Sequence, residues 1–198
     1  MKHVKGNMVE LFDKPTDILV HIVNCVALKS RPYSLCDSIV SKHKYANPYS
    51  KRRPLKKNLA HRDSRPQVGT VNFCFPKNKD GPIVANCFSQ FRMGDYNSRY
   101  YMNCPHEIDE DYVNMSQNHD SYKHRLKYFK FCLMDEMIPF IRQNNEIKRI
   151  IFPMNIGCGV AKGKWRDYKN IIYKFEKCLF EKEEDKFKYE IIIVELVE

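Results

Sequence analysis

The stretch that decides the fold is KRIIFPMNIGCGVAKGKW, residues 148–165. Its first half is an apolar run typical of a strand buried on both faces of a sheet, and its second half holds three glycines, at positions 157, 159 and 163. A strand, a glycine-rich turn and a helix in this order leave backbone N–H groups free to bind an anion at the start of the helix. A tight connection that binds nothing produces the same pattern, so this turn alone does not establish a function. The following helix is indicated by apolar residues at Tyr168, Ile172, Phe175 and Leu179.

Further strands are predicted on both sides of this stretch. DILVHIVNC (17–25) is an almost continuous β-branched run, typical of a strand covered on both faces. GTVNFCFP (69–76) and PIVANCFSQ (82–90) are separated by a turn that contains Asp80-Gly81, so we expect two neighbouring strands. KYEIIIVELV (188–197) has the composition of a final strand.

One long amphipathic helix is predicted before residue 148. Asp120 or Ser121 can cap its start, and Pro139 is expected to kink or shorten its end. Its apolar face consists of Tyr122, Leu126, Phe129, Leu133, Met137 and Ile141. Strands and helices therefore alternate along most of the chain, which predicts a single α/β domain over residues 1–198 with helices on both faces of the sheet.

The composition is that of a folded protein, because 198 residues with 43% hydrophobic content can form a core. No run approaches the ~18 apolar residues that cross a bilayer, and the residues at the amino terminus lack the apolar run that is typical of a signal peptide. We therefore expect a monomer located in the cytoplasm or the nucleus, without a membrane partner.

The eight cysteines occur singly, which favours free thiols over disulfides or a zinc site. No metal and no cofactor are expected.

The formal net charge of +10 favours an anionic partner, either a nucleotide or a nucleic acid. Much of the excess lies in residues 42–65, which contain prolines and no helical periodicity. A solvated loop and a phosphate-contacting loop are both compatible with that segment. Its part 51–62 is the candidate for contacts with a nucleic-acid backbone.

Four motifs taken in order resemble one known family. KGNMVELF (5–12), DILVHIVNC, PIVANCFSQ and IIFPMNIGCGVAKGKW (150–165) are similar in order and spacing to macrodomains of the ADP-ribose 1''-phosphate phosphatase and ADP-ribose glycohydrolase kind. The most specific piece is FPxxIGCGxAxGxW. The resemblance implies a three-layer α/β/α sandwich with a mixed central sheet and two insertions, at about 42–67 and 92–120, which could form a lid or a separate partner surface. The bias toward Lys, Asn and Ile is typical of an AT-rich genome such as a viral one.

The resemblance also implies a ligand, namely ADP-ribose or a derivative phosphorylated or esterified on the distal ribose. Asn24 would face the distal ribose at the carboxyl end of its strand, and Asn7 would bond to the exocyclic amine of adenine. Arg31 is a candidate for binding two phosphate oxygens at once, and the turn at 157–161 would offer its N–H groups to the diphosphate. The predicted ligand-binding residues are Asn7, Met8, Asn24, Arg31, Gln90, Ile156, Gly157, Cys158, Gly159, Val160 and Ala161.

Hydrolysis of this ligand is the favoured activity, with Asn24 positioning a water molecule and Asp37 assisting with its proton. Asp37 could instead cap a helix expected at 38–44, and His21 is expected to be a core histidine. Ala161 stands where one branch of the family has an aspartate, so the lysine-adduct mechanism of that branch is not expected. Two alternatives stay open: a reader that binds ADP-ribose without turnover, and a basic nucleic-acid-binding module.

Overall fold

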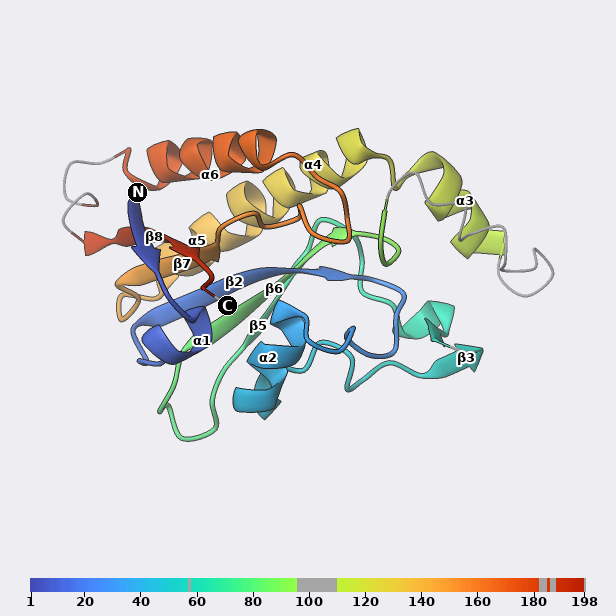
Figure 1. Ribbon diagram of the computed structural model, residues 1–198, viewed down its shortest axis with the longest axis horizontal. Helices are drawn as coiled ribbons and strands as arrows, with labels where there is room; N and C mark the ends of the chain where they lie inside the picture. Colours follow the sequence, from blue (N-terminus) through green and yellow to red (C-terminus); the bar gives the residue numbers. More distant parts are fainter. Residues whose placement is uncertain (57, 96–109, 182–184, 186–187, 198) are drawn as a thin grey trace.

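The computed structural model describes residues 1–56, 58–95, 110–181, 185 and 188–197. Its centre is a six-stranded sheet in the order β1-β8-β7-β2-β6-β5 (Figure 1). Neighbouring strands are parallel except for β5, which pairs antiparallel with β6, so the sheet is mixed as predicted. The strands are β1 (Lys2–Lys5), β2 (Asp17–Asn24), β5 (Val71–Cys74), β6 (Ile83–Gln90), β7 (Arg149–Pro153) and β8 (Glu190–Glu195).

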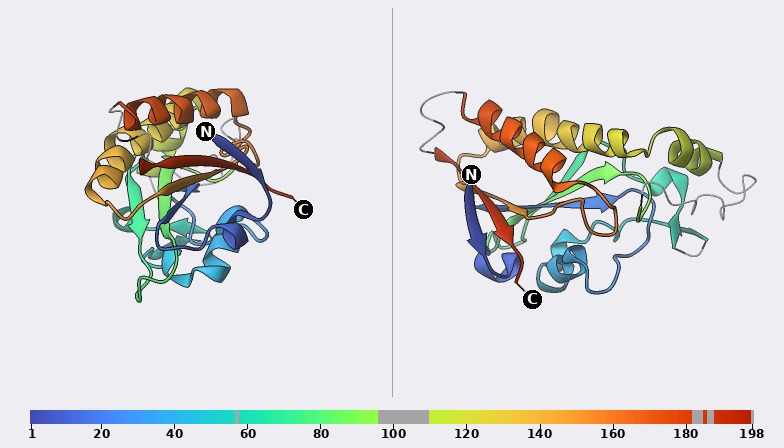
Figure 2. Two further views of the ribbon diagram at one scale, coloured as in Figure 1. Left: turned by 90° about the vertical axis from the view of Figure 1, so that its left-hand side faces the viewer. Right: turned by 45° about the horizontal axis from the view of Figure 1, so that its top comes forward.

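Helices cover both faces of the sheet, which confirms the predicted three layers (Figure 1 and Figure 2). One layer contains α4 (Tyr122–Phe131), α5 (Ile138–Gln143) and α6 (Trp165–Leu179). The opposite layer contains α1 (Met8–Leu11) and α2 (Leu35–Lys42). Among the helices of the described residues, none is long and apolar enough to cross a membrane.

The two faces of β2 explain why its sequence is continuously apolar. Ile18 and Val20 belong to the core that contains the buried residues of α4 and α6, whereas Leu19 belongs to the core that contains Met8 and Ile39 of α1 and α2. All three β2 side chains are fully buried. Because β2 lies between β7 and β6, all three parallel, the carboxyl ends of these strands meet at one edge of the sheet.

The helix predicted from residue 121 onward is not uniform. Ser121 caps it by accepting a hydrogen bond from the His124 N–H, but Cys132–Met137 forms a π-helical turn between α4 and α5. Pro139 lies in the first turn of α5. Proline has no N–H to donate, and its ring needs space against the preceding turn, so a wider turn at this point is physically expected. Pro139 is thus associated with a π turn that the sequence pattern did not indicate.

The insertion 42–67 packs beside the loop that follows β2. It contains the two-stranded sheet of β3 (Pro54–Lys56) and β4 (Leu59–Ala60), and the Ala60 N–H donates to the Val26 carbonyl at 2.7 Å. Two of its arginines, Arg52 and Arg65, have buried side chains. This part of the chain therefore supports the β2 loop, and Arg52 is not available to a nucleic acid. Its 3-10 helices are η1 (Lys44–Ala46) and η2 (Arg62–Ser64).

The insertion 92–120 is described only in part. Residues 96–109 lie outside the described residues, whereas α3 (Glu110–Asn118) packs Tyr112 and Val113 into a cluster with Phe91.

The seven cysteines that the structure describes are free thiols: Cys25, Cys36, Cys74, Cys87, Cys132, Cys158 and Cys178. Cys104 lies outside the described residues.

Candidate functional site

A cavity of about 300 Å³ opens at the carboxyl ends of β2, β6 and β7. Its size lies at the lower end of the range for small-molecule sites. Three segments surround it: residues 21–36 with Tyr49, residues 90–94, and residues 153–161 with Leu196. The predicted site residues that line it are Asn24, Arg31, Gln90, Ile156, Gly157, Gly159, Val160 and Ala161.

The turn at 156–161, here called the glycine turn, presents unused backbone donors to this cavity. Among the described residues, none accepts a hydrogen bond from the N–H of Gly157, Gly159, Val160 or Ala161. All four residues line the cavity. Converging free N–H groups of this kind form a site for an anion such as phosphate.

Cys158 departs from the predicted role. Its N–H donates to the Asn155 carbonyl at 2.9 Å, so it is already used within the turn. Its thiol contacts the Ile156 carbonyl and packs against the core, and burial raises its pKa to about 11. Cys158 therefore shapes the glycine turn but does not line the cavity.

The two glycines of the GCG motif have different physical roles. Gly157 has φ +73°, and a Cβ there would lie 2.4 Å from the Tyr168 ring. A Cβ at Gly159 would meet nothing within 4 Å. The fold therefore requires glycine at 157, whereas position 159 is open toward the cavity.

We expect Gly157→Ala to lower the free energy of unfolding by about 2 kcal/mol or more, since it combines a left-handed backbone with overlap on Tyr168. Gly159→Ala is the matched control and should change stability by less than about 0.5 kcal/mol. Urea denaturation of both variants measures the difference. Equal stability of the two would contradict the packing described for Tyr168.

The start of α2 lines the same cavity as the glycine turn. Ser34 caps this helix by accepting from the Asp37 N–H, and Ser34, Leu35 and Cys36 all line the cavity. The N–H groups of Leu35 and Cys36 donate to no described residue. Because a helix start carries partial positive charge, it adds to the attraction for an anion. Arg31 is exposed at the same place and forms no ion pair with a described carboxylate.

Asn24 has a mainly structural set of contacts. Its side-chain oxygen accepts from the N–H groups of Val26 and Ala27 at 3.1 and 2.7 Å, which folds the chain back after β2. Its carbonyl accepts from Arg52 Nη2 at 2.6 Å. Asn24 lines the cavity, but its amide oxygen is already engaged by the loop.

Asp37 is placed where it organises the loop before α2. Its carboxylate accepts from the Ser30 hydroxyl and from the Tyr33 N–H, each at 3.1 Å. Asp37 does not line the cavity, and α2 begins at Leu35 with Ser34 as its cap, so the helix start predicted at Ser38 is wrong. Both carboxylate oxygens of Asp37 accept hydrogen bonds from this loop, and its assistance in proton transfer stays a prediction.

Asn7 and Met8 also lie away from the cavity lining. The Asn7 side chain accepts from the Val9 N–H at 3.0 Å and caps α1. Met8 is fully buried in the core on that side of the sheet. Asn7 is exposed, so its predicted contact with adenine stays a prediction, whereas Met8 has no exposed surface to offer a ligand.

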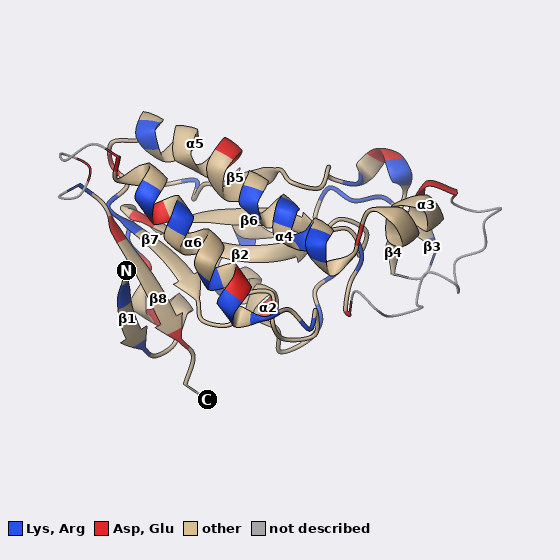
Figure 3. Cartoon of the chain, turned by 90° about the horizontal axis from the view of Figure 1, so that it is seen from above, with Lys and Arg blue, Asp and Glu red and all other residues tan. Residues whose placement is uncertain are grey.

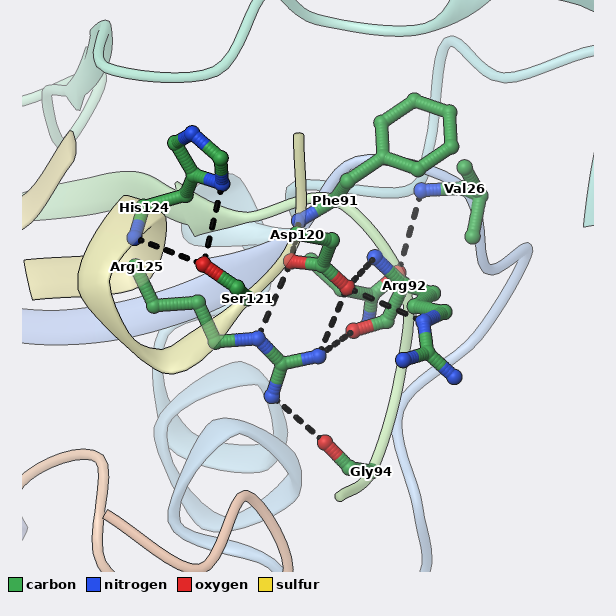
Figure 4. A network of polar contacts seen from close by, with 9 residues as sticks. Val26, Phe91, Arg92, Gly94, Asp120, Ser121, His124 and Arg125 are labelled. Atoms are coloured by element: carbon green, nitrogen blue, oxygen red, sulfur yellow. Dashed lines mark hydrogen bonds and ion pairs between the residues drawn. The ribbon is translucent and has the colours of Figure 1, made fainter. Parts of the chain in front are cut away.

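The side of the cavity formed by residues 90–94 is held by a buried ionic network (Figure 4). Asp120 accepts from Arg125 Nε and Nη2 at 2.9 and 2.7 Å, and Arg92 Nε lies 3.2 Å from its carboxylate. The Asp120 carboxylate also accepts from the N–H of Phe91 at 2.9 Å, and Arg125 donates to the Gly94 carbonyl at 2.6 Å. All three charged side chains are almost inaccessible to solvent. Gln90, Met93 and Gly94 are thereby positioned along the cavity.

A solved structure of the macrodomain of Thermus aquaticus DarG is similar to this chain, with a TM-score of 0.51 and 17% sequence identity. The similarity covers 98% of this chain and 97% of that one. This is the macrodomain fold. No family model matches the chain, and no curated protein sequence matches it.

Tyr49 is a cavity residue of this macrodomain fold that sequence reasoning missed. It comes from the insertion 42–67, lines the cavity beside Cys36, and its ring lies 4.6 Å from the Arg52 guanidinium. Arg52 in turn donates to the carbonyls of Asn24 and Ala27. The basic composition of the segment did not indicate that Arg52 is buried or that Tyr49 lines the cavity, because a buried arginine and an exposed arginine look identical in sequence.

His21 lies in β2 of the macrodomain sheet as the buried histidine that the sequence predicted. Its Nε2 is hydrogen-bonded to the Asn86 side-chain oxygen, since the Asn86 amide nitrogen donates to the Ala46 carbonyl. Burial lowers the pKa of His21 to about 4, while the bond to Asn86 acts in the opposite direction. The imidazole is therefore neutral at pH 7 in the folded protein.

This lowered pKa predicts a loss of stability in acid. Between pH 6.5 and about 4 the unfolded chain binds a proton at His21 and the folded chain does not, so stability is full above pH 6.5 and decreases below it. The loss attributable to His21 is about 3 kcal/mol. Urea denaturation at pH 7 and pH 4.5 should show a smaller decrease for His21→Gln than for the unmodified protein. An identical decrease in both proteins would refute the assignment.

Proposed function

We propose that this chain binds ADP-ribose, or a derivative modified on the distal ribose, in the cavity between the glycine turn and the start of α2. The observation that carries the proposal is a set of backbone N–H groups around the cavity that donate to none of the described residues, four from the glycine turn and two from α2. A diphosphate can accept from both sets at once, because each phosphate has several acceptor oxygens. The macrodomain fold is consistent with this ligand.

The rest of the cavity suits the two ends of such a molecule. Met154, Pro153 and Leu196 offer apolar surface that suits a flat base. Asn24, Gln90 and Tyr49 offer polar groups at another part of the lining, which suits a ribose. Arg31 adds a cation that can bind two phosphate oxygens.

We propose binding without turnover. The lining contributed by the described residues contains no carboxylate, and its one histidine has a pKa near 4 and is already hydrogen-bonded. Asp37 does not line the cavity, and both of its carboxylate oxygens accept hydrogen bonds from the loop before α2. Hydrolysis needs a group that can take a proton from water, and these residues supply none with access to the ligand.

Isothermal titration calorimetry with ADP-ribose, AMP, ADP and ATP tests this proposal. We expect ADP-ribose to bind at least tenfold more tightly than the other three, since only ADP-ribose combines a diphosphate with a second ribose. Incubation with ADP-ribose 1''-phosphate should release no phosphate. Absence of heat with all ligands would refute binding, and rapid phosphate release would refute the reader assignment.

A further inference from the structure

The positive charge of this protein is distributed unevenly between its interior and one surface. Arg52, Arg65, Arg92 and Arg125 have buried side chains, and Arg149 is paired with the buried Asp17. These arginines hold the fold together. The excess of +10 must therefore be carried mainly by exposed side chains.

Six exposed basic residues lie on α4 and α6, and we call them the α4–α6 basic face. Figure 3 shows Lys and Arg gathered along these two neighbouring helices with few acidic residues among them. On α4 the spacing of three and four residues places three lysines in one row on the solvent side, opposite the buried Arg125 and Phe129. The members are Lys123, Lys127, Lys130, Arg166, Lys174 and Lys177.

Most of the charge of this face is not neutralised by carboxylates of the described residues, since only Arg166 has an acidic partner among them. None of its five lysines forms an ion pair with a described carboxylate. Of the two acidic residues of α6, Asp167 pairs with a member of the face and Glu176 has a partner outside it. Asp167 accepts from the Tyr122 hydroxyl at 2.8 Å and contacts Arg166, and Glu176 pairs with the amino group of Met1.

We propose that the α4–α6 basic face binds the phosphate backbone of a nucleic acid. Arg166 and Lys177 of α6 lie eleven residues apart on this helix, so the face extends for roughly 17 Å, long enough for contacts with several consecutive phosphates. Tyr173 is 47% exposed on the same helix and lies 4.7 Å from the Lys177 ammonium. An exposed ring beside a cation can stack with an unpaired base, which favours a single strand.

This face is separate from the proposed ADP-ribose site. The cavity lies at the carboxyl ends of the strands, whereas the face lies on the outer side of the helical layer (Figure 2 and Figure 3). None of the six residues lines the cavity. Both ligands can therefore bind at the same time, and each site can be altered without the other.

Fluorescence anisotropy with a labelled 20-nucleotide single strand tests the proposal, with DNA, RNA and duplex versions of one sequence compared. About four phosphate contacts predict a roughly 50-fold loss of affinity between 50 and 200 mM salt. The triple variant Lys123→Glu, Lys127→Glu and Lys130→Glu should weaken binding at least 30-fold. Binding by the unmodified protein that is absent, or that does not depend on salt, would overturn the proposal.

A matched control has the same change of charge elsewhere, in the segment 51–62: Lys51→Glu, Lys56→Glu and Arg62→Glu. It should retain affinity within about threefold, and an equal loss would show an effect of net charge alone and overturn the proposal.

If the first triple variant fails to fold, Lys174→Glu with Lys177→Glu provides the same test on α6. Tighter binding to anionic phospholipid vesicles than to the oligonucleotides would also overturn it. Gly159→Glu should retain oligonucleotide binding, so failure of one site is distinguishable from failure of the other.

Discussion

Gly159→Glu is expected to abolish ADP-ribose binding while leaving the protein folded. A Cβ at position 159 would meet no atom of the described residues within 4 Å, and the backbone there does not require glycine, so stability should be unaffected. The new carboxylate would lie in the cavity beside the free N–H groups of Val160 and Ala161, where the proposal places phosphate. Two like charges about 4 Å apart repel by roughly 4 kcal/mol at an effective dielectric constant near 20. We therefore expect a loss of affinity of at least about 100-fold.

Calorimetry of Gly159→Glu and of Gly159→Ala, together with their thermal unfolding, measures this effect. The alanine variant adds a methyl group without charge and should bind within about threefold of the unmodified protein. Unchanged affinity in a folded Gly159→Glu protein would show that phosphate does not bind at the glycine turn, and the proposed function would then be wrong. A loss of affinity accompanied by a lower Tm would point to altered folding, contrary to the expectation.

Asp120→Asn is expected to cause the largest loss of stability. The substitution keeps the size of the side chain but leaves Arg92 and Arg125, which are 2% and 1% exposed, without their shared carboxylate. Removing one partner from a buried ionic network costs about 3–5 kcal/mol, because the remaining charge has lost its solvation and its partner. The N–H groups of Phe91 and Arg92 also lose a charged acceptor.

Urea denaturation of Asp120→Asn should show this loss, and Asp63→Asn is the matched control. Asp63 pairs with Arg53 at 3.2 Å, but both side chains are about two-thirds exposed. Exposed pairs contribute about 1 kcal/mol or less, so the control should be nearly neutral. Comparable effects of the two substitutions would show that burial does not set the strength of the Asp120 network.

Several features of this molecule were predictable because they depend on local pattern. The β-branched run of β2, the turn between β5 and β6, and the apolar spacing of α6 each indicate one structure through side-chain periodicity. The glycine turn was predictable for the same reason, because glycines directly after a buried strand indicate a backbone that bends without side chains. These patterns gave the α/β class and the three layers, both of which the structure confirms.

The details of the site were less predictable. Resemblance assigned Cys158 a free N–H, but the turn closes on itself through the Asn155 carbonyl. Asp37 lies in the segment that was predicted to contribute to the site, but its carboxylate accepts hydrogen bonds from Ser30 and Tyr33 and does not line the cavity. Tyr49 and Arg52 lie in a segment whose composition indicated only positive charge.

The sequence by itself determined the order of strands and helices, the position of the glycine turn, and the net positive charge, since each is a property of neighbouring residues or of composition. Only the tertiary structure decided which N–H groups stay unpaired, which arginines are buried, and which lysines form one face. Those properties depend on residues far apart in the chain, such as Asp120 with Arg92 or Tyr49 with Cys36. Hydrogen bonding and solvation are set by such neighbours, and they exist only after the layers have packed together.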